Sequence, residues 1–232
     1  MWFKFNGISS KEFPDLVVKK LPTISSTPNL LEEISIEGKG SAFRIKGKKL
    51  RNKTIECYLR SKENLDGIIE WLSTDQEEVT LVTSDEPDKT YYVRVNEEIT
   101  FSKASRLRVF NIPLTIMPYK YDADTKIEFQ DGQEFTVDNN NSLSCYPYIL
   151  LSNPSSQISI SLDGEEICSV GPIEEGVDTS IHIDCQRYKV YNNRNVMYNV
   201  KMTGDFFSLE KGEHTITVSG SAGTFFPMFR WR

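Results

Sequence analysis

Ser180, His182 and Asp184 are the residues of this sequence whose types and spacing come nearest to a catalytic group, that of a serine hydrolase. In such an enzyme a histidine within about 3 Å takes the proton of the serine hydroxyl, and an acid orients the histidine. The surrounding residues alternate between polar and apolar, which predicts a strand with all three on one face. Positions two apart on a strand are separated by roughly 6.5 Å, and triad members usually come from separate elements. We therefore interpret the three residues as the polar face of a strand.

Adjacent glutamates could suggest glycoside hydrolysis, which places two carboxyl groups on either side of one glycosidic bond. Neighbours on a strand point to opposite faces, so the two members of one pair cannot serve the same bond. We expect these pairs to be solvated surface: Glu32 and Glu33, Glu77 and Glu78, Glu97 and Glu98, Glu165 and Glu166, Glu174 and Glu175.

The remaining candidates for chemistry are four cysteines and one further histidine. Cys57, Cys145, Cys168 and Cys185 form no C-x-x-C pair, and we read no histidine near them as a metal ligand by its spacing, so we expect small core side chains and no zinc site. His214 follows a turn, and we interpret it as an exposed or satisfied residue at the start of a strand. The sequence therefore predicts no catalytic residue, no metal site and no cofactor, and the protein is expected not to be an enzyme.

A group of tyrosines in the second half could bind rather than react. Aromatic faces on β-sandwiches often stack against sugars, but tyrosine is also favoured in strands and at protein interfaces. The residues proposed for contact with a sugar or a protein partner are Tyr146, Tyr148, Tyr188 and Tyr191.

Charge and hydropathy exclude several partners. The chain has 27 basic and 33 acidic residues, a formal charge of −6, and we read the two signs as interspersed. This balance predicts no stripe for a nucleic-acid backbone and no polybasic membrane patch. The start of the sequence lacks the apolar stretch of a signal peptide, and no run approaches the roughly 20 apolar residues of a membrane helix. We expect a soluble protein without membrane insertion.

Most of the chain has a period of two, as expected for half-buried antiparallel strands such as Thr54–Leu59, Tyr91–Val95 and Arg106–Phe110. Three dipeptides favour tight hairpin turns: Asn6-Gly7, Asp131-Gly132 and Asp163-Gly164. Gly38-Lys39-Gly40 is interpreted as a turn between a strand at Glu33–Glu37 and another at Ala42–Lys46.

One stretch has helical spacing. From Lys62 to Ser73 we expect a helix of about three turns with Ser61 as its N-cap and Glu63 in its first turn. Its core residues are predicted to be Leu65, Ile68, Ile69 and Leu72.

The last strand of the first half is expected to end near Tyr119, and polar sequence follows from Asp122. This change predicts two domains, residues 1–121 and 122–232. The second contains about seven or eight candidate strands at spacings typical of a β-sandwich. Near the C-terminus, a strand at Ile216–Val218 precedes a turn at Gly220–Gly223 and a final strand that includes Phe229 and Trp231.

The ordered motifs along the chain resemble those of siphophage distal tail proteins. At the C-terminal end these are Gly204-Asp205-Phe206, the turn at Lys211-Gly212, the strand Ile216-Thr217-Val218 and the ending Phe229-Arg230-Trp231-Arg232. Earlier come Phe3–Phe13, Leu21-Pro22, Glu70-Trp71-Leu72, Ser84–Tyr92, Pro118–Tyr121 and Ile181–Cys185. The chain departs from the family at Glu37–Ser41, where many members have a Pro-Gly-Arg-Asp-Gly type turn.

This resemblance implies a mainly β protein of the minimal two-domain form: a ring-forming tail-tube-like domain with one helix and a galectin-like β-sandwich. Six copies would close a ring at the tip of a phage or prophage tail, with DNA only passing through its channel. The expected partners are the tail-tube protein, the tail-tip protein and a receptor-binding protein, with assembly in the cytoplasm of the host bacterium. An intersubunit arm is expected at Ile34–Ile45, with Ile34, Ile36, Lys39, Phe43 and Ile45 as its residues.

Two other functions remain open at this point. The first alternative is a carbohydrate-binding adhesin that acts through the second domain, and a hydrolase comes a distant third.

Overall fold

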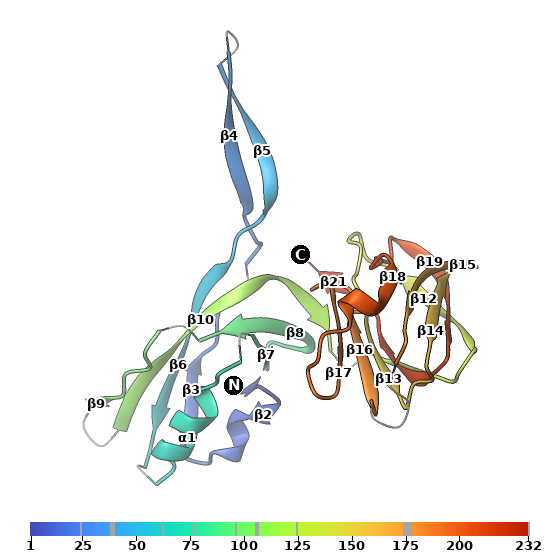
Figure 1. Ribbon diagram of the computed structural model, residues 1–232. Helices are drawn as coiled ribbons and strands as arrows, with labels where there is room; N and C mark the ends of the chain where they lie inside the picture. Colours follow the sequence, from blue (N-terminus) through green and yellow to red (C-terminus); the bar gives the residue numbers. More distant parts are fainter. Residues whose placement is uncertain are drawn as a thin grey trace. The chain divides into compact units, whose positions relative to one another are not determined.

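The computed structural model describes all of residues 1–232 except 24, 38, 39, 62, 77, 96, 105, 106, 124, 174–177 and 232, and omits the side chains of Ile36 and Ala104. The chain is mainly β and forms two compact units, Met1–Ala123 and Asp124–Trp231 (Figure 1). The sequence predicted a domain boundary near residue 121, and we treat each unit by itself.

Unit 1 is built on one antiparallel sheet with the order β2-β1-β7-β8-β10-β6-β3, and β9 also pairs with β10. Its long central strand, β10, pairs with β6 on one side and with β8 on the other. The strands of this sheet are β1 (Phe3–Phe5), β2 (Ile8–Ser9), β3 (Leu16–Lys20), β6 (Arg51–Leu59), β7 (Val79–Thr83), β8 (Glu86–Arg94), β9 (Ser102–Ala104) and β10 (Leu107–Asp122).

Two prolines lie within β10, although proline cannot donate a ladder hydrogen bond. The register with β8 shifts between Ile116 and Lys120, and Pro118 lies inside this bulge. A bulge leaves residues unpaired, so it accommodates a proline without loss of a ladder bond. Strand β10 therefore continues to Asp122, beyond the point near Tyr119 where the sequence predicted its end.

Helix α1 (Leu65–Leu72) is shorter than predicted and turns a different face to the core. Ile68 and Leu72 are fully buried and Leu65 packs against the core, but Ile69 is 41% exposed, so its predicted core role was wrong. Trp71 is buried instead, which centres the buried stripe near Ile68 and places Ile69 about 100° away.

The side chain of Trp71 explains this rotation. Its Nε1 donates to the carbonyl oxygen of Phe5 at 3.0 Å, and its ring stacks on Phe13 and on Phe3 with centroid separations of 4.8 and 5.4 Å. The prediction of Ser61 as N-cap was also wrong, since α1 begins after Asn64. Among the described residues, no helix is long and apolar enough to cross a membrane.

The hairpin of β4 (Asn29–Ile36) and β5 (Gly40–Lys48) forms a separate two-stranded sheet. Both strands are longer than the sequence predicted, and their pairing runs from Asn29 opposite Lys48 to Ile36 opposite Gly40. A register shift between Leu30 and Leu31 marks a β-bulge near the base.

Unit 2 is an antiparallel β-sandwich with two five-stranded sheets among its described residues. The first has the order β11 (Ile127–Phe129), β20 (Ala222–Phe226), β13 (Tyr148–Ser152), β16 (Ser180–Asp184) and β17 (Lys189–Asn192). The second has the order β12 (Glu134–Asn139), β19 (Gly212–Ser219), β14 (Ile158–Leu162), β15 (Glu165–Val170) and β18 (Met202–Gly204). Two short 3₁₀ helices, η1 (Ser10–Glu12) and η2 (Asn199–Lys201), and the strand β21 (Arg230–Trp231) complete the chain's elements.

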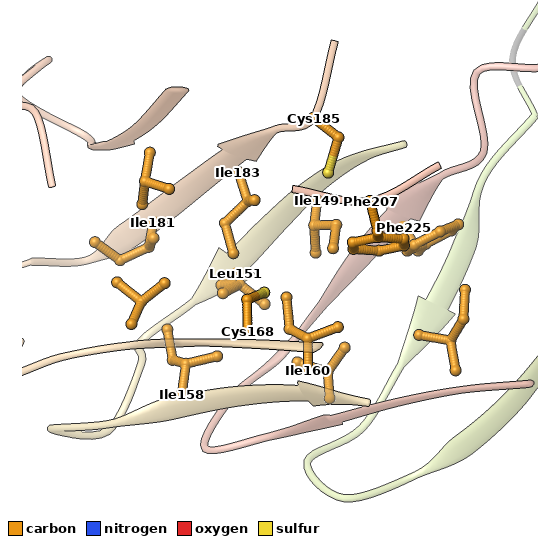
Figure 2. Packing of buried hydrophobic residues seen from close by; sticks show 14 of the residues in the cluster. Ile149, Leu151, Ile158, Ile160, Cys168, Ile181, Ile183, Cys185, Phe207 and Phe225 are labelled. Atoms are coloured by element: carbon orange, nitrogen blue, oxygen red, sulfur yellow. The ribbon is translucent and has the colours of Figure 1, made fainter. Parts of the chain in front are cut away.

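Alternate residues of both sheets meet in the core of unit 2 (Figure 2). Ile149 and Ile181 come from the first sheet and Ile160 from the second, and all are fully buried. The predicted burial of the cysteines is confirmed for all four. Burial raises the pKa of Cys168 and of Cys185 to about 12, so these thiols remain protonated at neutral pH.

Two of the three predicted hairpin turns are confirmed. Asn6-Gly7 joins β1 to β2 and Asp163-Gly164 joins β14 to β15, and every one of these residues has positive φ as a primed turn requires. The Asp131-Gly132 prediction was wrong, because the turn connects β11 to β12 in different sheets. Asp131 Oδ1 instead accepts a hydrogen bond from Gly220 N at 2.7 Å.

The C-terminal residues also differ from the expected final strand. After β20 the backbone turns at Met228, where φ is 56°, and β21 contains Arg230 and Trp231 without Phe229. Arg230 Nε donates to the carbonyl oxygen of Ser144 at 2.7 Å, and its guanidinium lies 4.6 Å from the Tyr146 ring centroid.

Gly204 in the Gly-Asp-Phe motif has a backbone role. Its φ is +90°, and a Cβ at this position would lie 2.2 Å from the carbonyl oxygen of Ile167. Close contact between β18 and β15 thus requires glycine here.

We predict that Gly204→Ala lowers the free energy of unfolding of unit 2 by about 2 kcal/mol more than Gly132→Ala does. Gly132 also has positive φ, at +69°, but its added Cβ would meet no atom within 4 Å. Denaturant titration with labelling of the Cys168 thiol measures both variants. Equal destabilisation would show that backbone crowding at Gly204 contributes nothing.

Candidate interaction surfaces

The structure brings Ser180 and His182 together, although the sequence argument excluded this. Ser180 Oγ lies 3.1 Å from His182 Nε2, because the two side chains lean toward each other across the spacing of their Cα atoms. Asp184, the candidate acid of a triad, nevertheless does not contact His182. The Asp184 carboxylate binds the backbone N and guanidinium of Arg187, at 3.0 and 2.9 Å.

Tyr148 occupies the position that an orienting acid would take. Its hydroxyl lies 2.5 Å from His182 Nδ1, so both ring nitrogens of His182 contact hydroxyl groups. Burial lowers the pKa of His182, which favours the neutral ring. Within the described part of the chain, His182 has no carboxylate partner of the kind that activates a histidine in acyl transfer.

The four candidate tyrosines do not form one platform. Tyr148 and Tyr191 lie on either side of His182 on the outer face of the first sheet, and the rings of Tyr191 and His182 stack with centroids 4.8 Å apart. Tyr146 lies under Arg230, and the exposed Tyr188 makes a T-shaped ring contact with Phe206.

A shallow depression beside Tyr191 combines an aromatic ring with polar groups. Its lining residues are Asp184, Arg187, Lys189, Tyr191, Asn195 and Met197. The sequence argument identified Tyr191 and placed Asp184 on a polar strand face. It missed Arg187, Lys189 and Asn195, which lie on β17 and in the turns on either side of it. Carboxylate, guanidinium and amide groups around an aromatic ring suit a ligand with many hydroxyl groups.

The β4–β5 hairpin exposes large apolar side chains in unit 1. Leu31, Phe43 and Ile45 are 52%, 72% and 62% exposed. The register places Leu31 opposite Ile45 and Glu33 opposite Phe43. Because residues directly opposite each other share a face, these three apolar side chains lie on one face of the hairpin.

The predicted arm residues are therefore divided between two faces. Ile34 lies on the face opposite Phe43 and Ile45, together with Glu32, which forms an ion pair with Lys46 at 2.6 Å. Lys39 and the side chain of Ile36 lie outside the described residues. Leu31 was missed because the sequence placed the start of this strand at Glu33.

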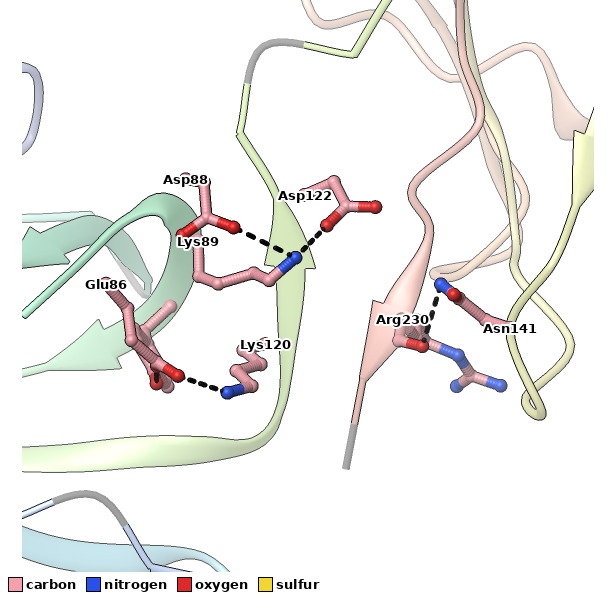
Figure 3. Close-up of polar contacts among 8 residues, drawn as sticks. Glu86, Asp88, Lys89, Lys120, Asp122, Asn141 and Arg230 are labelled. Atoms are coloured by element: carbon pink, nitrogen blue, oxygen red, sulfur yellow. Dashed lines mark hydrogen bonds and ion pairs between the residues drawn. The ribbon is translucent and has the colours of Figure 1, made fainter.

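The segments around Glu86 and Lys120 hold β8 and β10 together (Figure 3). Glu86 pairs with Lys120 and accepts a hydrogen bond from the Tyr91 hydroxyl, and Lys89 pairs with Asp122. Burial opposes ionisation of Glu86, but the hydrogen bonds from Lys120 and Tyr91 outweigh it and lower its pKa. These ion pairs join the motif at Ser84–Tyr92 to the end of β10.

Of the two readings that the sequence left open for His214, exposed or satisfied, the structure supports the second, with two partners. Its Nδ1 lies 3.0 Å from Asp163 Oδ2 and its Nε2 lies 3.1 Å from the carbonyl oxygen of Glu210. Partial burial disfavours the charged ring, but these acceptors outweigh burial and raise the pKa of His214. Across the described residues, no group of histidine, cysteine and acidic side chains could hold a metal ion.

Each unit matches a family of phage tail proteins. Residues 15–116 match the phage tail protein RIFT-related domain, and residues 140–229 match the C-terminal domain of the siphovirus-type tail component. A search of curated proteins gives no match.

Solved structures of tail hubs share the fold of the whole chain. The Dit protein of phage SPP1, described as a paradigm of the hub adsorption apparatus in phages that infect Gram-positive bacteria, covers 100% of this chain and 99% of its own, with a TM-score of 0.64 and 14% identity. A chain of the phage p2 baseplate in its activated conformation with Sr covers 100% of this chain and 98% of its own, with a TM-score of 0.63 and 10% identity.

We predict that His214→Gln removes a pH-dependent part of the stability of unit 2. Since the folded state raises the pKa of His214 above 6.5, its contribution is complete below that pH and is lost as the pH rises through the folded-state pKa. Thermal unfolding from pH 5 to 9 should show a decline in the wild type that the variant lacks. His182→Gln should keep the decline, and its loss in that control instead would contradict the assignment to His214.

Proposed function

The chain belongs to the siphovirus distal tail (Dit) family, and on this premise we propose that it closes, with five further copies, into a ring at the tip of a phage tail. As a member of this family it is a structural component of a phage tail hub. Our proposal goes further than family membership: it concerns the six-fold ring, the contacts between its copies and its neighbours in the tail.

The observation that carries this proposal is the exposed apolar face of the β4–β5 hairpin. Soluble monomers rarely expose a contiguous group such as Leu31, Phe43 and Ile45, so its exposure favours burial against another protein. A closed ring uses heterologous contacts, in which one surface of a subunit meets a different surface of the next. A projecting arm is well suited to such a contact because it reaches beyond its own unit.

The ring would join the tail tube to the tail-tip protein and, through unit 2, to receptor-binding proteins. Its central channel would let DNA pass, and the acidic net charge of −6 per copy disfavours retention of DNA there. Assembly would take place in the cytoplasm of the host bacterium, and the finished protein would lie at the tail tip. This role requires neither a cofactor nor a catalytic residue.

A second candidate function is supported by the depression beside Tyr191. A hydroxyl-rich ligand such as a cell-wall saccharide could stack on Tyr191 and form hydrogen bonds with Asp184, Arg187 and Asn195. In that case unit 2 would act as an adhesin that contacts the host directly.

Light scattering on a sizing column, over a range of concentrations, tests the ring. We expect a species of about six times 26.6 kDa, or about 160 kDa. A monomer at every concentration would contradict self-assembly of the isolated protein.

Aspartate at two arm positions tests the apolar face. We expect the double variant Phe43→Asp and Ile45→Asp to abolish the ring and leave the monomer folded, since both side chains are exposed. Val200→Asp is the matched control, because Val200 is 94% exposed on unit 2. A ring that survives the arm variant would contradict the assignment of the arm.

For the second function, Tyr191→Ala should weaken binding of cell-wall saccharide fragments to the full-length protein by roughly fivefold. Tyr188→Ala is the control, since Tyr188 is exposed but lies outside the depression. Calorimetry that detects no binding to the wild type would exclude the adhesin for the saccharides tested.

A further inference from the structure

One buried charged group of unit 1 has a donor without an acceptor. Among the described residues, Arg51 Nε is the one buried side-chain nitrogen or oxygen atom that has no hydrogen-bond partner. The other two guanidinium nitrogens donate to backbone carbonyl oxygens, Nη1 to Ser25 at 2.7 Å and Nη2 to Met117 at 3.4 Å. A buried donor without an acceptor destabilises a fold, and more so when the group is charged. A ligand that accepts a hydrogen bond from Nε would remove this cost.

A small cavity lies beside this guanidinium. Four neighbouring strands of the sheet, β7, β8, β10 and β6, supply most of its wall, with the residues Arg51, Lys53, Leu81, Thr83, Tyr91 and Ile116. Pro22 and Thr23 line it from the segment between β3 and β4. The centres of water-sized spheres can occupy about 20 Å³ of it. About 10 to 15 Å³ of such space holds one water molecule, so the cavity accepts one ligand of similar size.

Two residues of the wall are cations without a direct counterion. Arg51 and Lys53 are two apart on β6 and therefore lie on the same face of the sheet. Within the described part of the chain, neither forms an ion pair with a carboxylate, and Lys53 Nζ donates to Ser25 Oγ at 3.2 Å. The charge of Glu86 acts on Arg51, but Glu86 is already paired with Lys120 (Figure 3). These side chains together carry three positive charges and one negative charge.

The surplus of positive charge distinguishes between an ion and a water molecule. Burial lowers the pKa of Arg51, so the surroundings disfavour its positive charge although the charge of Glu86 offsets part of this effect. Arginine nevertheless stays ionised in proteins, and its charge has to be compensated in place. A water molecule could accept the bond from Nε but would bring no charge. A small anion would supply both an acceptor and a negative charge.

We propose that this cavity binds one small monovalent anion, chloride. Nε of Arg51 donates a hydrogen bond to it, and the charges of Arg51 and Lys53 attract it from the same face of the sheet. The site lies within unit 1 of a single copy. The inference therefore goes beyond the proposed ring and does not depend on it.

The bound anion would stabilise the base of the β4–β5 hairpin. The residues between β3 and β4 are already attached to the sheet through the bonds of Ser25, and Thr27 Oγ1 donates to the carbonyl oxygen of Pro118 at 2.8 Å. An anion in the cavity adds a contact between β6 and Pro22 or Thr23, which precede Ser25 in this segment. Because the segment leads into β4, chloride should hold both ends of the hairpin to the sheet.

Chlorine NMR of sodium chloride solutions containing the full-length protein tests the site directly. We expect the protein to broaden the chloride resonance. Arg51→Gln should weaken chloride binding roughly tenfold because it removes a charge and the Nε donor. Lys53→Gln should weaken it roughly threefold and keeps the guanidinium in place. Arg60→Gln and Lys103→Gln are the matched controls, since both residues are exposed and lie outside the cavity.

Thermal unfolding in two salts provides a second readout. Sodium chloride and sodium gluconate at equal ionic strength screen charges equally, so a difference between them reports binding of the anion to the folded state. We expect the midpoint, followed by tryptophan fluorescence of Trp2 and Trp71, to be about 3 °C higher in chloride. Arg51→Gln should abolish this difference. A merely structural role of Arg51 would lower the midpoint in both salts and leave the difference unchanged.

Three results would overturn the inference. A wild type that broadens the chloride resonance no more than Arg51→Gln does, with equal midpoints in the two salts, would leave one water molecule as the occupant. Unchanged chloride binding in a folded Arg51→Gln would place any bound chloride elsewhere. If Arg51→Gln does not fold, unchanged binding in Lys53→Gln overturns the site instead. Where the two readouts disagree, direct binding measured by NMR decides.

Discussion

Burial of alternate apolar side chains is the constraint on which the rest of this structure depends. Each strand has an inward and an outward face, so pairing and packing are settled by the inward residues. In unit 2, Ile149, Ile160 and Ile181 bring two sheets together, and the outward faces remain available for other contacts. In unit 1, β10 holds β6 and β8, and Trp71 fixes α1 against the sheet through its bond to Phe5.

The β4–β5 hairpin is the exception that points to function. It obeys the alternation of a strand, but its apolar face meets no core of its own, and Phe43 and Ile45 remain exposed. Such residues add no folding stability to the monomer, which favours our proposal that they are buried in an assembly.

The contacts of the outer face of unit 2 illustrate how far local reasoning reaches. Strand alternation placed Ser180, His182 and Asp184 on one face, which agrees with the structure, but the spacing of Cα atoms was a poor guide to side-chain contact. The partner of His182 is Tyr148, on a different strand, and the partner of Asp184 is Arg187 in the following turn. Only the pairing of β13 with β16 brings Tyr148 within reach of His182.

By itself, the sequence determined the mainly β fold, the buried cysteines, the position of the helix and the turns at Asn6-Gly7 and Asp163-Gly164. These features follow from the period of apolar residues and from local backbone preference, which neighbouring residues set. Tertiary structure decided that Asp131-Gly132 connects two sheets, that α1 buries Trp71 instead of Ile69, and that Gly204 must lack a side chain because the Ile167 carbonyl lies against it. Each depends on atoms that are distant in sequence, and their approach is fixed only when the strands pair and the sheets pack.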